Sequence, residues 1–151
     1  MPARMRVAAA LGALTAAAAI VYWALVFTGL FPVTELVPGY RQWFMSFPMA
    51  DAWIAVTGIW LFIALRRDSP VAAVAAASLG SALLFLGLYA LLYGVNTGLL
   101  FVLTVDEIIE IAIKLYCLSV GGFLVWFGIA RSSAGPAGAH APAGETPSAA
   151  R

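Results

Sequence analysis

Charged residues with regular spacing open the last long apolar segment of the chain, between Thr104 and Lys114. Because a helix turns by about 100° per residue, Asp106, Glu107, Glu110 and Lys114 would point into one arc of roughly 100°. Carboxylates beside an ammonium group can bind a proton, a small cation or a polar solute, or take part in acid and base chemistry. Any activity of this chain is therefore expected on this helix face.

The face that carries these charges continues through small residues, and the opposite face is bulky and apolar. In a membrane, small and polar faces pack against other helices, whereas bulky apolar faces contact lipid. The small residues on the charged face are Cys117, Gly121 and Gly128, and the bulky ones opposite are Ile108, Leu115, Phe123 and Trp126.

Glu110 and Lys114 are the least easily explained of the charged residues. Lys114 would lie about 12 Å along the helix axis from Asp106, where an unpaired charge costs several kcal/mol. The order Glu then Lys at i,i+4 is the favourable one, so the two are predicted to pair. Two interpretations stay open: the pair locks this helix against the third one, with Tyr89 or Tyr93 as a further hydrogen-bond partner, or Glu110 exchanges Lys114 for a ligand.

Asp51, Asp106 and Glu107 have a simpler explanation, although they remain candidate proton- or ion-binding residues. Each falls in the first turn of a predicted helix, where the helix dipole favours an anion. Thr104 and Glu107 also fit a capping box, in which each side chain bonds the backbone N–H of the other residue. No catalytic residue and no metal site is predicted from these positions.

Composition limits the possible functions. The chain is 64% hydrophobic and only 10% charged, which indicates a membrane protein. A net charge of +1 gives no reason to expect a nucleic-acid partner. The chain has a single cysteine, Cys117, which excludes an internal disulfide and a two-thiol redox cycle. It also has a single histidine, His140, which excludes bis-histidine haem ligation inside the bundle and histidine-containing zinc, copper or di-iron sites. No cofactor is predicted.

Four membrane-spanning helices are predicted, at about residues 7–30, 47–65, 70–93 and 105–130. Proline and glycine mark their ends: Pro32 ends the first helix, Pro48 and Pro70 begin the second and third, and Gly94 and Gly98 are expected to break the third near Tyr93. A basic start before an apolar run is also typical of a signal peptide, but this apolar run continues to Phe31, which favours a spanning helix.

The predicted fold is an all-α four-helix membrane bundle over residues 1–131, with a disordered cytoplasmic tail over residues 132–151. The tail is rich in Ala, Gly, Pro and Ser and has too few bulky apolar side chains to fold. Most basic residues fall on one side of this topology, namely Arg4, Arg6, Arg66, Arg67 and Arg131. The positive-inside rule then predicts a multi-pass protein of the bacterial inner membrane with both termini cytoplasmic, and the carboxylates gather at an outward mouth.

The segments Phe47–Trp53 and Leu115–Leu118 resemble those of small four-helix prokaryotic membrane proteins that form an uncharacterised family. The resemblance covers the region from the second to the fourth helix. It implies the architecture and no activity. Small multidrug exporters have a similar length and helix number, but they carry a carboxylate in the first helix, and residues 7–30 contain none here.

Three functions are compatible with this pattern. The first is a non-enzymatic membrane protein, either an accessory or structural subunit or a binder of a small ligand at the charged outward site. The second is a proton- or cation-coupled transporter of a small solute, and the third is a membrane-embedded enzyme that acts on a lipid-like substrate. Faces rich in Gly and Ala also predict association into a homo-oligomer or a larger membrane complex within the lipid bilayer.

Overall fold

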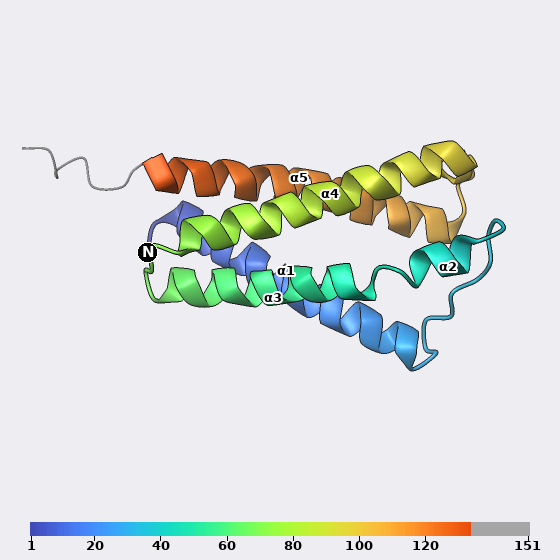
Figure 1. Cartoon of the computed structure of the whole chain (residues 1–151), viewed down its shortest axis with the longest axis horizontal. Helices are drawn as coiled ribbons and strands as arrows, with labels where there is room; N and C mark the ends of the chain where they lie inside the picture. The colour runs from blue at the N-terminus through green and yellow to red at the C-terminus, as the bar shows by residue number, and fades with distance from the viewer. Residues whose placement is uncertain (134–151) are drawn as a thin grey trace, which may run out of the picture.

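The computed structural model describes residues 1–133 of the chain, apart from the side chain of Asp106, and these residues form a helical bundle (Figure 1). No strand occurs in this part of the chain, so the predicted all-α fold is confirmed. The elements are α1 (Ala3–Phe27), α2 (Tyr40–Phe44), α3 (Pro48–Arg66), α4 (Ala72–Thr97), the short 3-10 helix η1 (Leu99–Phe101) and α5 (Val105–Ser133).

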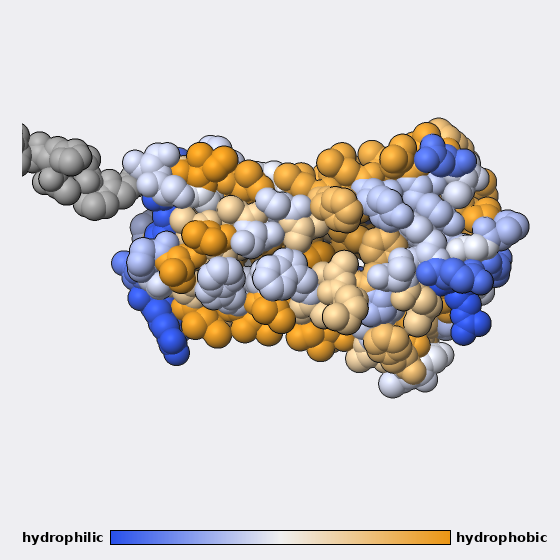
Figure 2. Space-filling model, in the orientation of Figure 1, coloured by the Kyte–Doolittle hydropathy of each residue, from blue (hydrophilic) through white to orange (hydrophobic). Residues whose placement is uncertain are grey.

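Four segments are long and apolar enough to cross a membrane, as the sequence predicts. They are Ala3–Phe27, Tyr40–Arg66, Ala72–Thr97 and Glu107–Ser133. On the face that Figure 2 shows, mostly apolar residues cover the middle of the molecule, and the most hydrophilic residues lie at its two ends. This distribution is the one expected for a bundle that lies across a bilayer.

Helix α1 begins and ends earlier than the sequence predicts. It starts at Ala3 rather than near residue 7, because Met5 packs in the core and the Arg4 guanidinium lies 5.5 Å from the ring centroid of Trp126. It ends at Phe27 rather than near residue 30, because Gly29 adopts a left-handed conformation with φ of 75°. The backbone N–H of Phe31 then bonds the carbonyl of Leu25, which closes the helix end before Pro32 is reached.

Helix α4 continues through Gly94 to Thr97, so the expected break at Gly94 is wrong. Gly94 is buried in the helix, and a Cβ atom added there would lie 3.4 Å from Nζ of Lys114. The missing side chain therefore makes room for the lysine head group instead of ending the helix. The helix ends at Gly98, whose φ of 76° is left-handed.

Helix α5 extends to Ser133, so the first two residues of the predicted tail are helical. Serine hydroxyls form hydrogen bonds to the backbone of the preceding turn: Ser132 Oγ donates to the carbonyl of Gly128, and Ser133 Oγ donates to that of Ile129. The rest of the predicted tail, residues 134–151, lies outside the described residues.

Helix α2 lies in a stretch that the sequence analysis treats only as a connection. Glu35 accepts hydrogen bonds from the backbone N–H of Gly39 at 2.6 Å and of Arg41 at 3.0 Å, which satisfies free donors at the start of this helix. Tyr40 and Phe44 are buried against Trp23 of α1. This packing fixes the connection over one end of the bundle.

Glycines set the closest helix contacts. A Cβ atom on Gly58 of α3 would lie 2.6 Å from the carbonyl oxygen of Gly12 in α1, and one on Gly80 of α4 would lie 2.8 Å from that of Gly121 in α5. The backbones in both pairs touch because no side chain separates them. The bundle is therefore built from two tight pairs, α1 with α3 and α4 with α5, which meet mainly where α3 packs on α4.

We call the end of the bundle that holds the N-terminus, the turn at Asp68 and the last turn of α5 the closed end. There Arg131 bonds Asp68 at 2.8 Å and α1 meets α5 through Arg4 and Trp126. We call the opposite end, which holds α2 and the start of α5, the open end. Helix α1 diverges from α5 toward this open end (Figure 1).

Candidate functional site

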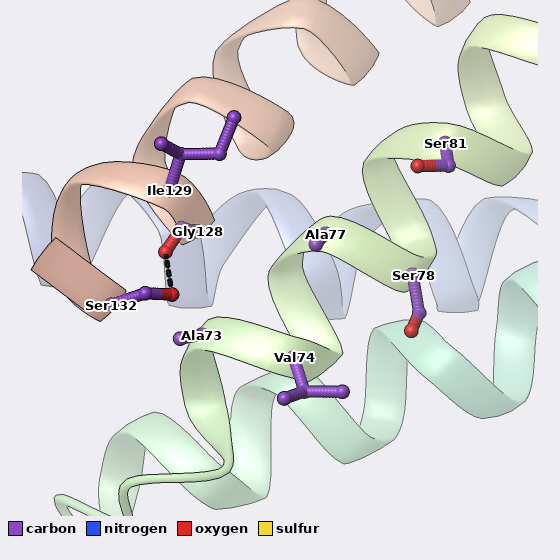
Figure 3. A pocket seen from close by; sticks show the side chains of 8 residues that line it. All are labelled: Ala73, Val74, Ala77, Ser78, Ser81, Gly128, Ile129 and Ser132. Carbon is purple, nitrogen blue, oxygen red and sulfur yellow. Dashed lines mark hydrogen bonds between the residues drawn. The ribbon is translucent and has the colours of Figure 1, made fainter.

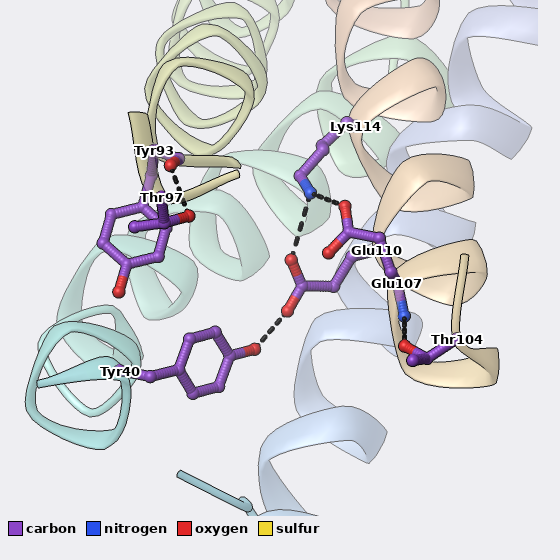
Figure 4. Close-up of polar contacts among 7 residues, drawn as sticks. All are labelled: Tyr40, Tyr93, Thr97, Thr104, Glu107, Glu110 and Lys114. Atoms are coloured by element: carbon purple, nitrogen blue, oxygen red, sulfur yellow. Dashed lines mark hydrogen bonds and ion pairs between the residues drawn. The ribbon is translucent and has the colours of Figure 1, made fainter. Parts of the chain in front are cut away.

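Lys114 is the centre of a polar cluster inside the open end (Figure 4). Its side chain is only 4% exposed, and its Nζ atom lies 2.8 Å from Oε1 of Glu107 and 3.1 Å from Oε2 of Glu110. The predicted pair of Glu110 and Lys114 is thus present, and a second carboxylate joins it from two turns earlier on the same helix. The spacing i, i+3, i+7 brings all three side chains to one face, as the helix geometry predicts.

Glu110 also bonds α2, because the Tyr40 hydroxyl donates a hydrogen bond to its Oε1 atom (Figure 4). One carboxylate therefore links an ammonium group of α5 to a phenol of the connecting helix. Glu110 is the most exposed member of the cluster, at 22%. It is therefore the group of the cluster that is most accessible to a ligand.

Glu107 has a different role from the one that the capping box predicts. The first half of the box is present, since the Thr104 hydroxyl accepts a hydrogen bond from the backbone N–H of Glu107 at 3.2 Å. The second half is not, because the Glu107 carboxylate turns inward to Lys114 and the Thr104 N–H bonds the carbonyl of Val102. Glu107 is 2% exposed, and its Oε2 atom has no partner among the described residues.

Asp51 forms a second polar contact in the open end. Its Oδ2 atom accepts a hydrogen bond from the indole N–H of Trp23 at 2.6 Å, across from α3 to α1. Asp51 makes no ion pair with a described residue, unlike Glu107 and Glu110. The side chain of Asp106 lies outside the part of the chain that the structure describes.

Tyr89 and Tyr93 do not bond Glu110 in the described structure, and the hydrogen-bond role that the sequence analysis assigns to them belongs to Tyr40. The ring of Tyr93 stacks on Trp43 with centroids 3.8 Å apart, and Tyr89 packs along the same indole at 6.3 Å. Both tyrosines thus support an aromatic wall that holds α2 against α4. Their rings position Tyr40 and Trp43 rather than the carboxylates directly.

A cavity of about 600 Å³ lies beside this cluster, between α1 and α5 at the open end. Its charged and polar lining includes Glu110, Lys114, Asp51 and Trp23, whereas Glu107 does not line it. Apolar side chains of α1, α3 and α4 form most of its walls. Thr15 of α1 and Tyr116 of α5 also line the cavity, and the 2.7 Å hydrogen bond between their hydroxyls ties these two helices together.

The cavity reaches the side surface of the bundle, which is the surface that would face lipid if the four apolar helices span a membrane. Three of its lining side chains, Leu14, Ile109 and Ile113, are exposed at the surface by 57%, 42% and 41%. A molecule dissolved in the membrane could therefore enter between α1 and α5 without crossing the bundle. Cys117, the only thiol of the chain, lines the inside of the same cavity and is 3% exposed.

A second hollow, of about 470 Å³, lies between α4 and the last turns of α5 at the closed end (Figure 3). Its walls are small or apolar, including Ala73, Ala77 and Gly128, and its only polar side chains are serines. Ser132, one of these serines, already donates to the carbonyl of Gly128. This hollow has no charged group among its lining residues and offers little chemistry.

Two residues of the open-end site are not among the sequence candidates, Tyr40 and Trp23. Each contacts a candidate carboxylate from far along the chain: Tyr40 is 70 positions from Glu110, and Trp23 is 28 positions from Asp51. The available signal was the preference of Trp and Tyr for membrane interfaces, which places them near an end of the bundle but names no partner.

Comparison with known proteins gave no match to a family model, to a curated protein or to a solved structure. The function must therefore be argued from the geometry of the open end.

Proposed function

We propose that this protein binds a small amphiphilic molecule in the cavity at the open end and does so without chemical turnover. The observation that carries this proposal is the combination of an apolar, laterally open cavity with a few charged groups gathered in its lining. Cavities of this size, with mostly apolar walls and few convergent polar groups, are typical of small-molecule sites.

The cavity favours ligand binding over a purely structural role for the cluster. A structural ion pair needs no free volume beside it, and the Lys114–Glu107 contact within α5 already compensates the buried charges. Glu110 instead lies at the cavity wall with contacts to two different partners. Its geometry suits a group that changes partner when a ligand enters.

The proposed location is the bacterial inner membrane, with both termini in the cytoplasm and the open end outward. The support is the distribution of basic residues: Arg4 and Arg131 lie at the closed end, together with Arg66 and Arg67 before the turn into α4. Loops rich in Arg and Lys are retained on the cytoplasmic side. The cavity would then receive molecules from the outer leaflet.

Native mass spectrometry of protein extracted gently from its own membranes tests the proposal. We expect the measured mass to exceed the mass of the chain, or of its homo-oligomer, by the mass of one small molecule per chain. In Glu110→Gln, we expect a smaller fraction of chains to carry this molecule. The matched control is Asp68→Asn, which makes the same chemical change at the closed end, where Asn tolerates the left-handed φ of 46°. Recovery with a stoichiometric foreign subunit and no small molecule would instead establish an accessory role.

Proton- or cation-coupled transport is the second candidate, favoured by the shared contacts of Glu110. A carboxylate held by both an ammonium group and a phenol can release one of them when a proton or cation arrives. In proteoliposomes, a transporter would show solute uptake that depends on a pH gradient and is lost in Glu110→Gln. Binding that is unaffected by a pH gradient, with no uptake, would leave the ligand-binding role alone.

A further inference from the structure

The charges and rings that line the open-end cavity indicate which head group it accepts. We infer that the ligand is a single-chain amphiphile with one positive charge, an alkylammonium ion, whose head group lies between Glu110 and Asp51. This inference rests on the proposed function and adds the chemical class of the ligand to it.

The charge balance of the site is the first argument. Glu107 and Lys114 are both almost fully buried and lie 2.8 Å apart, so their charges compensate each other. Counted in their ionised forms, Glu110 and Asp51 then leave an excess of negative charge, and Lys114 is the only cationic side chain that lines the cavity. An ammonium head group would offset one of these two negative charges, among mostly apolar walls where such a pairing is stronger than in water.

The aromatic lining is the second argument. Trp23, Trp43, Phe44 and Phe47 all contribute to the cavity wall beside the carboxylates. The faces of such rings attract cations, and cages of aromatic rings are a recurring way to recognise ammonium groups. A neutral or anionic head group would gain nothing from the ring faces and would leave the carboxylates uncompensated.

The same charges argue against the phospholipids of the bilayer as ligands. Every phospholipid carries a phosphate, and here a phosphate would lie near two carboxylates with only one lysine, which already holds Glu107 and Glu110. Repulsion between like charges would offset the attraction of any ammonium group on the same lipid. The aliphatic part of the ligand has a suitable wall in Ile54, Leu83 and Leu86.

The experiment measures quenching of tryptophan fluorescence by three brominated amphiphiles, with the full-length protein in phosphatidylcholine nanodiscs. The probes share a brominated undecyl chain and differ only in the head group: trimethylammonium, hydroxyl or carboxylate. All three enter the bilayer and quench exposed tryptophans in proportion to concentration, whereas binding in the cavity beside Trp23 and Trp43 adds a saturable component. We expect this saturable component for the cationic probe alone.

The variants Asp51→Asn and Glu110→Gln, singly and together, test whether the carboxylates select the charge. The double variant should weaken saturable binding of the cationic probe by at least about tenfold, which corresponds to about 1.4 kcal/mol. Asp51→Asn keeps an acceptor for the Trp23 N–H and leaves the Lys114 contacts untouched, so it remains informative if the other variants fold poorly. Asp68→Asn at the closed end is the control and should bind like the unaltered protein.

The outcomes separate the two proposals. Saturable quenching that is equal for all three probes, or strongest for the carboxylate probe, would overturn the cationic ligand and retain the cavity as a binding site. Saturable quenching by the cationic probe that survives the double variant would also overturn the assignment of the head group to Asp51 and Glu110. If none of the probes gave a saturable component, both the ligand class and the proposed binding function would be wrong.

Discussion

The closed and open ends of the bundle are held together in different ways. At the closed end and through the middle, small residues bring backbones into direct contact, as between Gly80 of α4 and Gly121 of α5. At the open end, α1 diverges from α5 (Figure 1), and other helix pairs are joined by large aromatic and charged side chains. Tyr40 of α2 bonds Glu110 of α5, which pairs with Lys114 of the same helix, and Trp23 of α1 bonds Asp51 of α3.

This difference explains why the cavity with charged groups in its lining forms at the open end. Where small residues meet, the backbones touch and set the packing, and the hollow at the closed end is lined only by small, apolar and serine side chains. Rings and ion pairs instead have fixed shapes and directional bonds, and they hold helices at a distance. The open end therefore combines rigid walls with free volume, which is what a binding site requires.

The largest effect is expected from Lys114→Met. The substitution leaves Glu107 nearly fully buried without a cation, and breaking a buried pair in this way costs about 3–5 kcal/mol. Unfolding in mixed detergent and dodecyl sulfate, followed by circular dichroism, measures the change. The double variant Glu107→Gln with Lys114→Met should recover most of the stability, and equal losses in both variants would show that the charge is not what holds the open end.

A smaller loss is expected at the tight contact of α4 with α5. In Gly121→Ala, the new Cβ atom would lie 2.9 Å from the carbonyl oxygen of Gly80, so the helices must move apart at a cost of about 1–3 kcal/mol. The neighbouring Gly122→Ala is the control, because a Cβ atom there meets nothing within 4 Å. It should stabilise α5 by up to about 1 kcal/mol. Similar values for the two variants in the same unfolding measurement would contradict close backbone packing.

The smallest effect concerns the bond that joins α1 to α5 beside the cavity. Tyr116→Phe removes the hydroxyl that bonds Thr15 and keeps the ring, so we expect a loss of about 0.5–1.5 kcal/mol. Tyr89→Phe removes a hydroxyl from a residue that is 44% exposed and should change the unfolding free energy little. If the two variants changed the unfolding free energy equally, the Thr15–Tyr116 hydrogen bond would not hold α1 to α5 beside the cavity.

The sequence is enough to predict the contacts that lie within one helix. The i,i+4 spacing of Glu110 and Lys114 and the shared face of Cys117 and Gly121 follow from helix geometry, and the structure has them as predicted. The same reasoning assigned Glu107 to a capping box, because local spacing favours the nearest backbone donor. The buried ammonium group of Lys114, two turns away, competes with that backbone donor for the Glu107 carboxylate and binds it at 2.8 Å.

Contacts between distant segments could not be predicted in this way. Tyr40 lies in a helix of five residues, too short for its apolar pattern to show which face is buried. Gly94 looked like a helix end because glycine often ends helices, and only the position of Lys114 shows that it makes room for a side chain. The cavity itself depends on how far α1 leans away from α5, which no local pattern specifies.

The proposed binding function requires that the gap between α1 and α5 is a cavity that a molecule from the bilayer can enter. The most direct measurement is the rate at which N-ethylmaleimide modifies Cys117 in membranes, since this lone thiol lines the cavity. Because Cys117 is 3% exposed, we predict slow but measurable modification in the folded protein, which slows by at least about a further tenfold in Ala90→Leu, where the larger side chain fills the cavity, and is unchanged in Gly122→Ala. A thiol that reacts only after unfolding, or a rate that Ala90→Leu leaves unchanged, would contradict this account.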